Sequence, residues 1–252
     1  MRKYVLKEFT GQEGVYYILK RKGRRRLDPA TLPVHQDNLN NWSYWDLMVN
    51  RSDNSIFQKA QKKHETGKLI SNQYQQNKII LKDRQQYICK KVLGKILDVG
   101  CFDGKLLCYL SAQGHDCYGI DFNDYYLESA GQKLKQMGCP EEKLKKGLFQ
   151  DIPFGEESFD TVVSQETLEH FYFPEIMLQE IKRVLRPGGC FTGSVPLENR
   201  IDSPSHIVYY TLSGIKTLLS NYFKIQELET MKSKPTNKAD NLIVWTVVKS
   251  EA

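Results

Sequence analysis

The sequence predicts an α/β protein in which parallel strands alternate with helices. The first strand is a short apolar run, residues 96–99, which is followed by Gly100, Gly104 and a helix pattern over residues 105–113. Later apolar runs alternate with helical segments in the same way, which is typical of a parallel sheet. These further strands are expected over residues 115–120, 144–149, 159–164 and 190–195.

The second half of this pattern contains residues that end helices and begin turns. A helix pattern over residues 174–185 ends at Arg-Pro-Gly-Gly, residues 186–189, which stops a helix and starts a turn. A long loop of residues 196–206 follows the fifth strand, and a helix over residues 211–220 comes next, with Thr211 as its candidate cap. Two last strands are expected over residues 223–229 and 242–248.

The front of the chain has a different organisation. Residues 2–9 and 15–20 predict two strands joined by a hairpin turn. Because a two-stranded ribbon is marginal alone, we expect it to pack on the main domain or on a partner subunit. The aromatic cluster at residues 42–45 is either a packing anchor or part of a substrate pocket wall, and helices are expected over residues 56–68 and 73–92. We therefore divide the chain into a basic ribbon and loop (1–45), a helical cover (46–92) and a main domain (93–252).

Charge is distributed unevenly between these parts. Residues 1–92 hold 19 Lys and Arg against 8 Asp and Glu, a net charge of +11, whereas residues 93–252 hold 17 against 22, a net charge of −5. The densest basic run, residues 21–26, either binds phosphates of a nucleic acid or an anionic substrate, or forms a solvated turn. The sequence leaves both interpretations open.

Composition limits the class of protein and the cellular compartment that we expect. No run reaches the about 18 apolar residues of a membrane span, and the polar N-terminus does not resemble a secretory signal. The six cysteines form no C-x-x-C pair, so we expect reduced thiols in a cytoplasmic protein and no metal site. Internal repeats are absent.

The turn after the first strand indicates the kind of ligand. Asp98 ends that strand beside a G-x-x-x-G turn, at the sheet edge where α/β proteins bind ligands. A dinucleotide fingerprint would read G-x-G-x-x-G, and a carboxylate at this place repels a pyrophosphate but attracts an ammonium group. A nucleoside that bears an amino acid, such as S-adenosylmethionine, therefore fits better than NAD.

A second carboxylate supports this interpretation. Asp121 ends the second strand, 23 residues after Asp98. An acid at this place of a βαβ unit commonly accepts hydrogen bonds from both ribose hydroxyls. The alternative is that Asp121 caps the helix that begins near residues 123–125.

Six segments, in order and correctly spaced, resemble class I S-adenosylmethionine-dependent methyltransferases. The similarity covers residues 93–252 and is closest to the small-molecule group that includes the ubiquinone and menaquinone methyltransferases (methyltransferase type 11). One departure is Phe102, where the family often has glycine. The segments are Asp98-Val-Gly-Cys-Phe-Asp-Gly, Tyr118-Gly-Ile-Asp-Phe, Gln150-Asp-Ile-Pro-Phe, Phe159-Asp-Thr-Val-Val-Ser, Leu168-Glu-His-Phe and Val184-Leu-Arg-Pro-Gly-Gly.

The resemblance implies a Rossmann-like, seven-stranded, mostly parallel sheet that ends in an antiparallel strand pair, with S-adenosyl-L-methionine as cofactor and S-adenosyl-L-homocysteine as product. It places Asp98 and the Gly100 backbone at the methionine end, Asp121 at the ribose and Gln165 near the sulfonium. Phe122, Asp151 and the Ile152 backbone are expected around the adenine. The full cofactor-binding set is Asp98, Gly100, Cys101, Gly104, Asp121, Phe122, Gln150, Asp151, Ile152 and Gln165.

Two histidines are candidates for the general base. His170 follows the fourth strand and His206 lies in the loop after the fifth, so both are expected at the active edge. An unperturbed imidazole pKa of about 6.5 suits proton abstraction from a hydroxyl. The alternative for each is a hydrogen-bonded structural histidine.

Three functional hypotheses follow. The first is a small-molecule methyltransferase, acting on a hydroxyl of a sugar or secondary metabolite. The second is an RNA or protein methyltransferase that docks through the basic front segment. The third is a cofactor-binding scaffold without catalysis. The front ribbon is also a candidate homodimer element, and transfer is expected to be independent of a metal.

Overall fold

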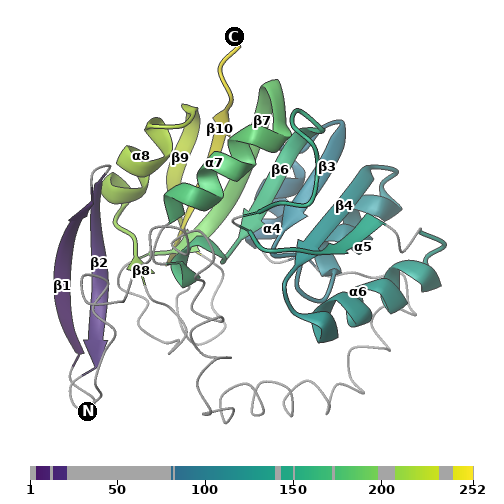
Figure 1. Ribbon diagram of the computed structural model, residues 1–252, viewed down its shortest axis with the longest axis horizontal. Coiled ribbons are helices and arrows are strands. Elements are labelled where there is room, and N and C mark those ends of the chain that lie inside the picture. The colour runs from purple at the N-terminus through teal and green to yellow at the C-terminus, as the bar shows by residue number, and fades with distance from the viewer. Residues whose placement is uncertain are drawn as a thin grey trace.

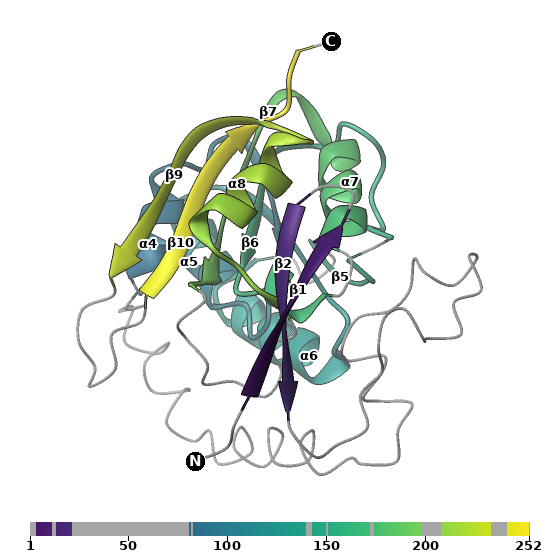
Figure 2. The same cartoon turned by 90° about the vertical axis from the view of Figure 1, so that its left-hand side faces the viewer.

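The structure, a computed structural model, is built around one twisted sheet with helices on both faces (Figures 1 and 2). Its seven strands have the order β5-β4-β3-β6-β7-β10-β9, and β10 alone runs antiparallel to its neighbours, β7 and β9. The predicted Rossmann-like sheet is therefore confirmed. The structure describes residues 4–11, 14–21, 81, 83–139, 143–149, 151–171, 174–197, 208–232 and 241–251.

Most strands begin and end within a few residues of where the sequence places them. The exception at the start of a strand is β7, which begins at Leu185 and includes residues 186–189, where the sequence predicted a turn. The central strand β3 lies buried between helices, which explains why it has apolar residues on both faces, as at Ile96 and Leu97. The strand bounds are Lys95–Val99 (β3), Asp116–Asp121 (β4), Leu144–Lys146 (β5), Phe159–Gln165 (β6), Leu185–Pro196 (β7), Lys224–Lys232 (β9) and Asn241–Val248 (β10).

Strand order reverses between β3 and β6. From β3 the chain continues to β4 and β5 on one side, whereas β6 and β7 lie on the other. In open α/β sheets a ligand crevice forms at such a switch point, outside the carboxyl ends of the strands. The fold therefore puts the ends of β3, β4 and β6 at the binding edge.

The helices cover the two faces through two apolar clusters. Ile96 on β3 packs with the cluster of the helices α4, α5 and α6, while its neighbour Leu97 packs with that of α7 and α8. This alternation follows from the two-residue period of a strand. The helix bounds are Asp83–Cys89 (α4), Lys105–Ala112 (α5), Asp124–Gln136 (α6), Pro174–Val184 (α7) and Leu212–Ser220 (α8).

The front ribbon forms a second, three-stranded sheet with a segment of the main domain. The strand β1 (Tyr4–Gly11) pairs antiparallel with β2 (Gly14–Arg21), and β2 pairs with β8 (Val208–Tyr209). The ribbon thus packs on its own chain, the first of the two expected arrangements. Figure 1 shows it at the side of the main sheet, beyond α8.

Several expectations fall outside the described residues. These are the basic residues 22–26, the aromatic cluster at 42–45, the helix over 56–68 and all but the first two residues of the expected loop over 196–206. Helix α4 lies within the expected helix over residues 73–92. The division into three domains stays a prediction. In the described part of the chain, no helix is long and apolar enough to cross a membrane.

One strand is shorter than predicted. The apolar pattern predicts residues 144–149, but β5 ends at Lys146. The Gly147 N–H donates to the Asp121 carbonyl (3.2 Å), and a Cβ at Gly147 would lie 2.7 Å from the Pro153 ring. The chain turns back there, since Leu148 forms an isolated antiparallel bridge with Asp151, and glycine lets the backbone pass close to Pro153.

Candidate functional site

A glycine turn joins β3 to α5 at the binding edge. Gly100 (φ 82°) and Gly104 (φ 73°) are both left-handed, a conformation that favours glycine. The N–H groups of Gly100 and Cys101 donate to the Ile120 carbonyl at the end of β4, each at 3.0 Å. A Cβ at Gly100 would lie 2.7 Å from Thr167 Oγ1, so glycine lets the turn pass close to the segment after β6.

Asp98 is a buried carboxylate at the tip of β3, with 2% of its surface exposed. Its Oδ1 accepts no hydrogen bond from the described residues. Burial, and then the charge of Asp121, raise the pKa of Asp98 to about 7. An ionised carboxylate that is buried in this way lowers the stability of the folded protein. The environment of Asp98 therefore favours a cationic donor such as an ammonium group.

Asp121 ends β4 and is held by the backbone. Its Oδ2 accepts from the Phe102 N–H (3.0 Å) and its Oδ1 from the Asn123 N–H (2.9 Å). Burial raises the pKa of Asp121 to about 6, and these backbone hydrogen bonds oppose the shift. Each oxygen keeps a second acceptor position, which suits a ribose diol.

The helix-cap alternative for Asp121 does not hold. The N-cap of α6 is Asn123, whose side chain accepts from the N–H groups of Tyr125 (3.0 Å) and Tyr126 (3.4 Å). Asp121 lies two residues earlier and orients this cap through the Asn123 N–H. Its carboxylate therefore belongs to the binding edge and not to the helix.

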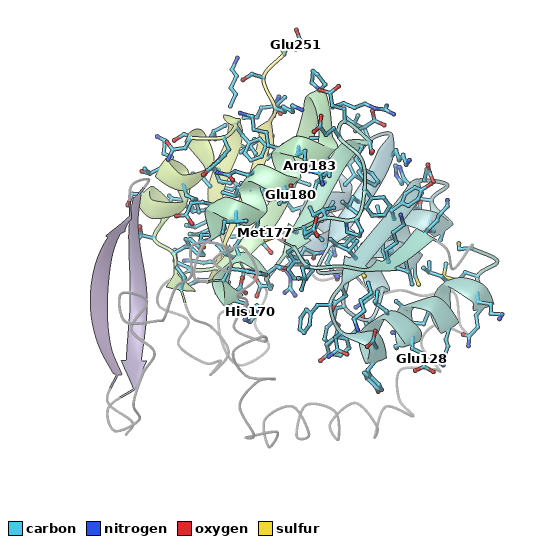
Figure 3. The ribbon with its side chains drawn as sticks, viewed as in Figure 1. Glu128, His170, Met177, Glu180, Arg183 and Glu251 are labelled. Carbon is cyan, nitrogen blue, oxygen red and sulfur yellow. The ribbon has the colours of Figure 1, made fainter. Side chains whose placement is uncertain are left out.

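Two residues of α7, which the sequence did not single out, fix the loop after β5. The Ile152 N–H donates to Glu180 (2.8 Å), and Arg183 donates to the carbonyls of Ile152 and Phe154, each at 2.9 Å. Arg183 also bonds both oxygens of Glu180, and Figure 3 shows the two side chains on the helix. Burial raises the pKa of Glu180, but the hydrogen bonds from Arg183 and Ile152 outweigh it and lower the pKa.

The expected adenine positions share this loop region. Asp151 is exposed at the start of the fixed loop, and Ile152 is buried. Phe122 is half-buried, with its ring edge-on to that of Phe149 (6.2 Å between centroids). Gln150 lies outside the described residues. The adenine roles stay predictions.

The end of β6 faces the same edge. The Gln165 Oε1 is buried and accepts no hydrogen bond from the described residues. Glu166 follows in a left-handed conformation (φ 52°), with its N–H on the Ser194 carbonyl (2.9 Å) and its carboxylate near Ser194 Oγ (3.4 Å). A left-handed glutamate at a strand tip is strained, and such strain concentrates at functional sites.

His170 lies at this carboxyl edge, at the end of the short helix η3 (Leu168–His170), as Figure 3 shows. Its side chain is 18% exposed, and its Nε2 lies 3.9 Å from an oxygen of buried Glu169. The structure thus brings His170 near the binding edge, as its sequence position predicts. His206, the other candidate base, lies outside the described residues.

Comparison with known proteins identifies the kind of domain at this site. Residues 97–192 match the family model described as Methyltransferase domain. These residues therefore form a methyltransferase domain, and the fold is that of class I S-adenosylmethionine-dependent methyltransferases. A solved S-adenosylmethionine-dependent methyltransferase from Methanosarcina mazei superimposes with a TM-score of 0.58 over 66% of this chain and 98% of its own, at 19% identity.

Curated relatives of this methyltransferase domain act on different substrates. A sterol 24-C-methyltransferase of Pneumocystis carinii (strain B80) is 38% identical over 98 residues, which is 38% of this chain but 26% of that protein. A ubiquinone biosynthesis O-methyltransferase of Aliivibrio fischeri (strain MJ11) is 26% identical over 165 residues, 64% of each chain. The chain thus spans about a quarter of the first relative and less than two thirds of the second.

The residues of the methyltransferase domain fit S-adenosyl-L-methionine, the cofactor of this family. The open acceptor atom of Asp98 suits the methionine ammonium, and Asp121 suits the ribose. At Gly100 and Gly104 the turn between them has no side chain, which leaves the backbone open to a ligand at this edge. Among the described residues, no group of His, Cys, Asp and Glu is arranged to hold a metal.

Proposed function

We propose that this chain is an S-adenosylmethionine-dependent methyltransferase that methylates a hydroxyl of a small molecule, such as a sugar or a secondary metabolite. The observation that carries the proposal is the pair of buried carboxylates, Asp98 and Asp121, on either side of the glycine turn. One keeps an open acceptor atom and the other is oriented by backbone N–H groups. Both features match a ligand that has an ammonium group and a diol.

In the proposed reaction the cofactor supplies an electrophilic methyl group on a sulfonium whose sulfur leaves as a neutral thioether. Asp98 holds the amino end and Asp121 the ribose, so that the methyl group lies in line with the acceptor oxygen. His170 takes the hydroxyl proton as the new oxygen–carbon bond forms. The Gln165 oxygen lines the pocket between these groups.

Calorimetric titration of the purified protein with S-adenosylmethionine and S-adenosylhomocysteine tests the cofactor part. We expect micromolar dissociation constants for both, followed by methyl transfer to hydroxylated metabolites in a mass-spectrometric screen. Absence of binding by either compound would contradict the proposal and favour the scaffold hypothesis. Cofactor binding with transfer to amines or carbons alone would contradict the choice of a hydroxyl.

A second candidate is a methyltransferase that docks on RNA. It is favoured by the net charge of +11 on residues 1–92, which contrasts with the −5 of the remainder. Binding to phosphates through this segment would weaken steeply as salt rises. A gel shift with RNA between about 50 and 200 mM salt separates the two candidates, since a small-molecule enzyme gives no salt-sensitive shift.

The proposal includes the organisation of the chain. We propose a cytoplasmic enzyme whose residues 93–252 carry catalysis, with a helical cover over residues 46–92 and a basic ribbon and loop over residues 1–45. A homodimer through the ribbon is part of the proposal. Deletion of residues 1–26 tests it, because an unchanged molecular mass in solution would count against a dimer through this segment.

A further inference from the structure

The glycine turn contains one residue, Phe102, whose backbone conformation is unfavourable for its residue type. Phe102 lies between Gly100 and Gly104 with φ 50°, in the left-handed region that a phenylalanine enters only at a cost. Glycine would adopt this conformation freely, and the related family often has glycine at this position. A bulky residue kept in a strained conformation points to a function for its side chain.

The backbone of Phe102 fixes where this side chain begins. Its N–H donates to Asp121 Oδ2 at 3.0 Å, and that bond joins the turn after β3 to the tip of β4. The Phe102 ring therefore starts beside the carboxylate that is proposed to hold the ribose. It also lies two residues before Gly104, within the turn that the cofactor must contact.

The ring of Phe102 is not part of the core. It is 40% exposed, and it packs against Tyr126 on the first turn of α6, with the ring centroids 4.0 Å apart. Burial, and then the charge of Asp121, raise the pKa of Tyr126 to about 12, so its phenol stays neutral and remains a donor. Packing inside the protein thus uses only part of the Phe102 surface.

We propose that Phe102 and Tyr126 form an aromatic clamp that contacts the ribose-to-sulfonium part of the bound cofactor and slows its release. The inference rests on the proposed function. Covering the exposed part of the ring removes apolar surface from water, and a ring next to a sulfonium attracts its positive charge. The clamp also shields Asp121 from water, which strengthens its hydrogen bonds to the diol.

The test compares cofactor binding by the full-length wild type and by Phe102→Gly, Phe102→Tyr and Met137→Ala. Met137 is a matched control because it is a large apolar residue, 37% exposed, that follows the far end of α6. Calorimetry gives the dissociation constants of S-adenosylmethionine and S-adenosylhomocysteine, and stopped-flow displacement gives the release rates. Thermal unfolding without ligand reports on folding.

We expect Phe102→Gly to weaken S-adenosylmethionine binding about five- to tenfold and to speed its release by a similar factor, with little change in melting temperature. Phe102→Tyr should restore the affinity, and Met137→Ala should leave it unchanged. Wild-type affinity in Phe102→Gly would overturn the clamp and leave the proposed function intact. Failure of the wild type to bind either compound would overturn both.

Discussion

The two strand tips that bear the candidate cofactor residues differ from the tip that bears the candidate acceptor residues. At β3 and β4 the backbone holds the site, since Gly100, Cys101, Phe102 and Asn123 all donate to atoms at the end of β4. At β6 the site consists of side chains on a short helix, with a strained Glu166 and a half-buried His170. Backbone hydrogen bonds therefore fix the candidate cofactor side, whereas the candidate acceptor side depends on the placement of individual side chains.

The largest expected effect is on the rate of catalysis, when the candidate base of the β6 side is removed. His170→Ala should lower kcat by about 100-fold or more, because a positioned base contributes that much to proton transfer. Cofactor affinity should not change, because His170 is proposed to contact the acceptor hydroxyl and not the cofactor. Steady-state kinetics and calorimetry measure the two quantities. An unchanged kcat would move the role of base to His206.

At the backbone-held side, Asp98→Asn should weaken S-adenosylmethionine binding about 100-fold, since the charge that meets the ammonium group is lost. The same variant should be more stable without ligand, because the wild type buries a carboxylate whose Oδ1 accepts no hydrogen bond from the described residues. Calorimetry and thermal unfolding report on these opposite effects. A matched control is Asp116→Asn, an exposed aspartate that also lies in the β-sheet but at the start of its strand.

The loop after β5 is held in place by side chains of the helix α7. Arg183→Met removes the donors to two carbonyls and the partner of Glu180, so the free energy of unfolding should fall by about 2 kcal/mol. Urea unfolding measures this free energy. Arg186→Met is the control, because its pair with Asp160 is more exposed and should be worth less than about 1 kcal/mol. Equal losses in both variants would mean that the loop is held in another way.

The pH dependence follows from the two raised carboxyl pKa values, about 7 for Asp98 and about 6 for Asp121, against an ordinary value of 3.8. Between about pH 4 and 7 the folded protein binds more protons than the unfolded chain, so the stability of the free protein should fall as pH rises and then level off. Cofactor affinity should rise about tenfold from pH 6 to 8, because the ammonium group selects the ionised Asp98. Calorimetry at several pH values measures this, and Asp98→Asn should flatten the profile.

The smallest effect concerns the glycine turn. Gly100→Ala combines a left-handed strain with a Cβ 2.7 Å from Thr167, whereas Gly114→Ala has a similar strain (φ 87°) and no atom within 4 Å. We expect Gly100→Ala to be the less stable by about 1 kcal/mol, because buried Thr167 must shift. Urea unfolding of the two variants isolates the cost of close approach. Equal stabilities would show that Thr167 yields freely.

Much of this molecule was determined by the sequence itself. Strands β3 and β6 carry buried apolar residues on both faces, such as Ile96 and Leu97, so the sequence showed them as buried strands, and the parallel sheet and its carboxyl edge follow from them. Asp98 and Asp121 were found because strand ends are visible as the points where apolar runs meet acids and glycines. The position of these two carboxylates at neighbouring strand ends could therefore be predicted, while their roles toward a cofactor stay predictions.

The tertiary structure decided what depends on residues far apart in the chain. It showed that β5 ends at Lys146, that Arg183 and Glu180 hold the Ile152 loop across about 30 positions, and that Phe102 rests on Tyr126. It also placed the ribbon against β8, which the local pattern left open. The physical reason is that strand and turn preferences are short-range, whereas a carbonyl finds its donor, and a ring its partner, only once distant segments have packed together.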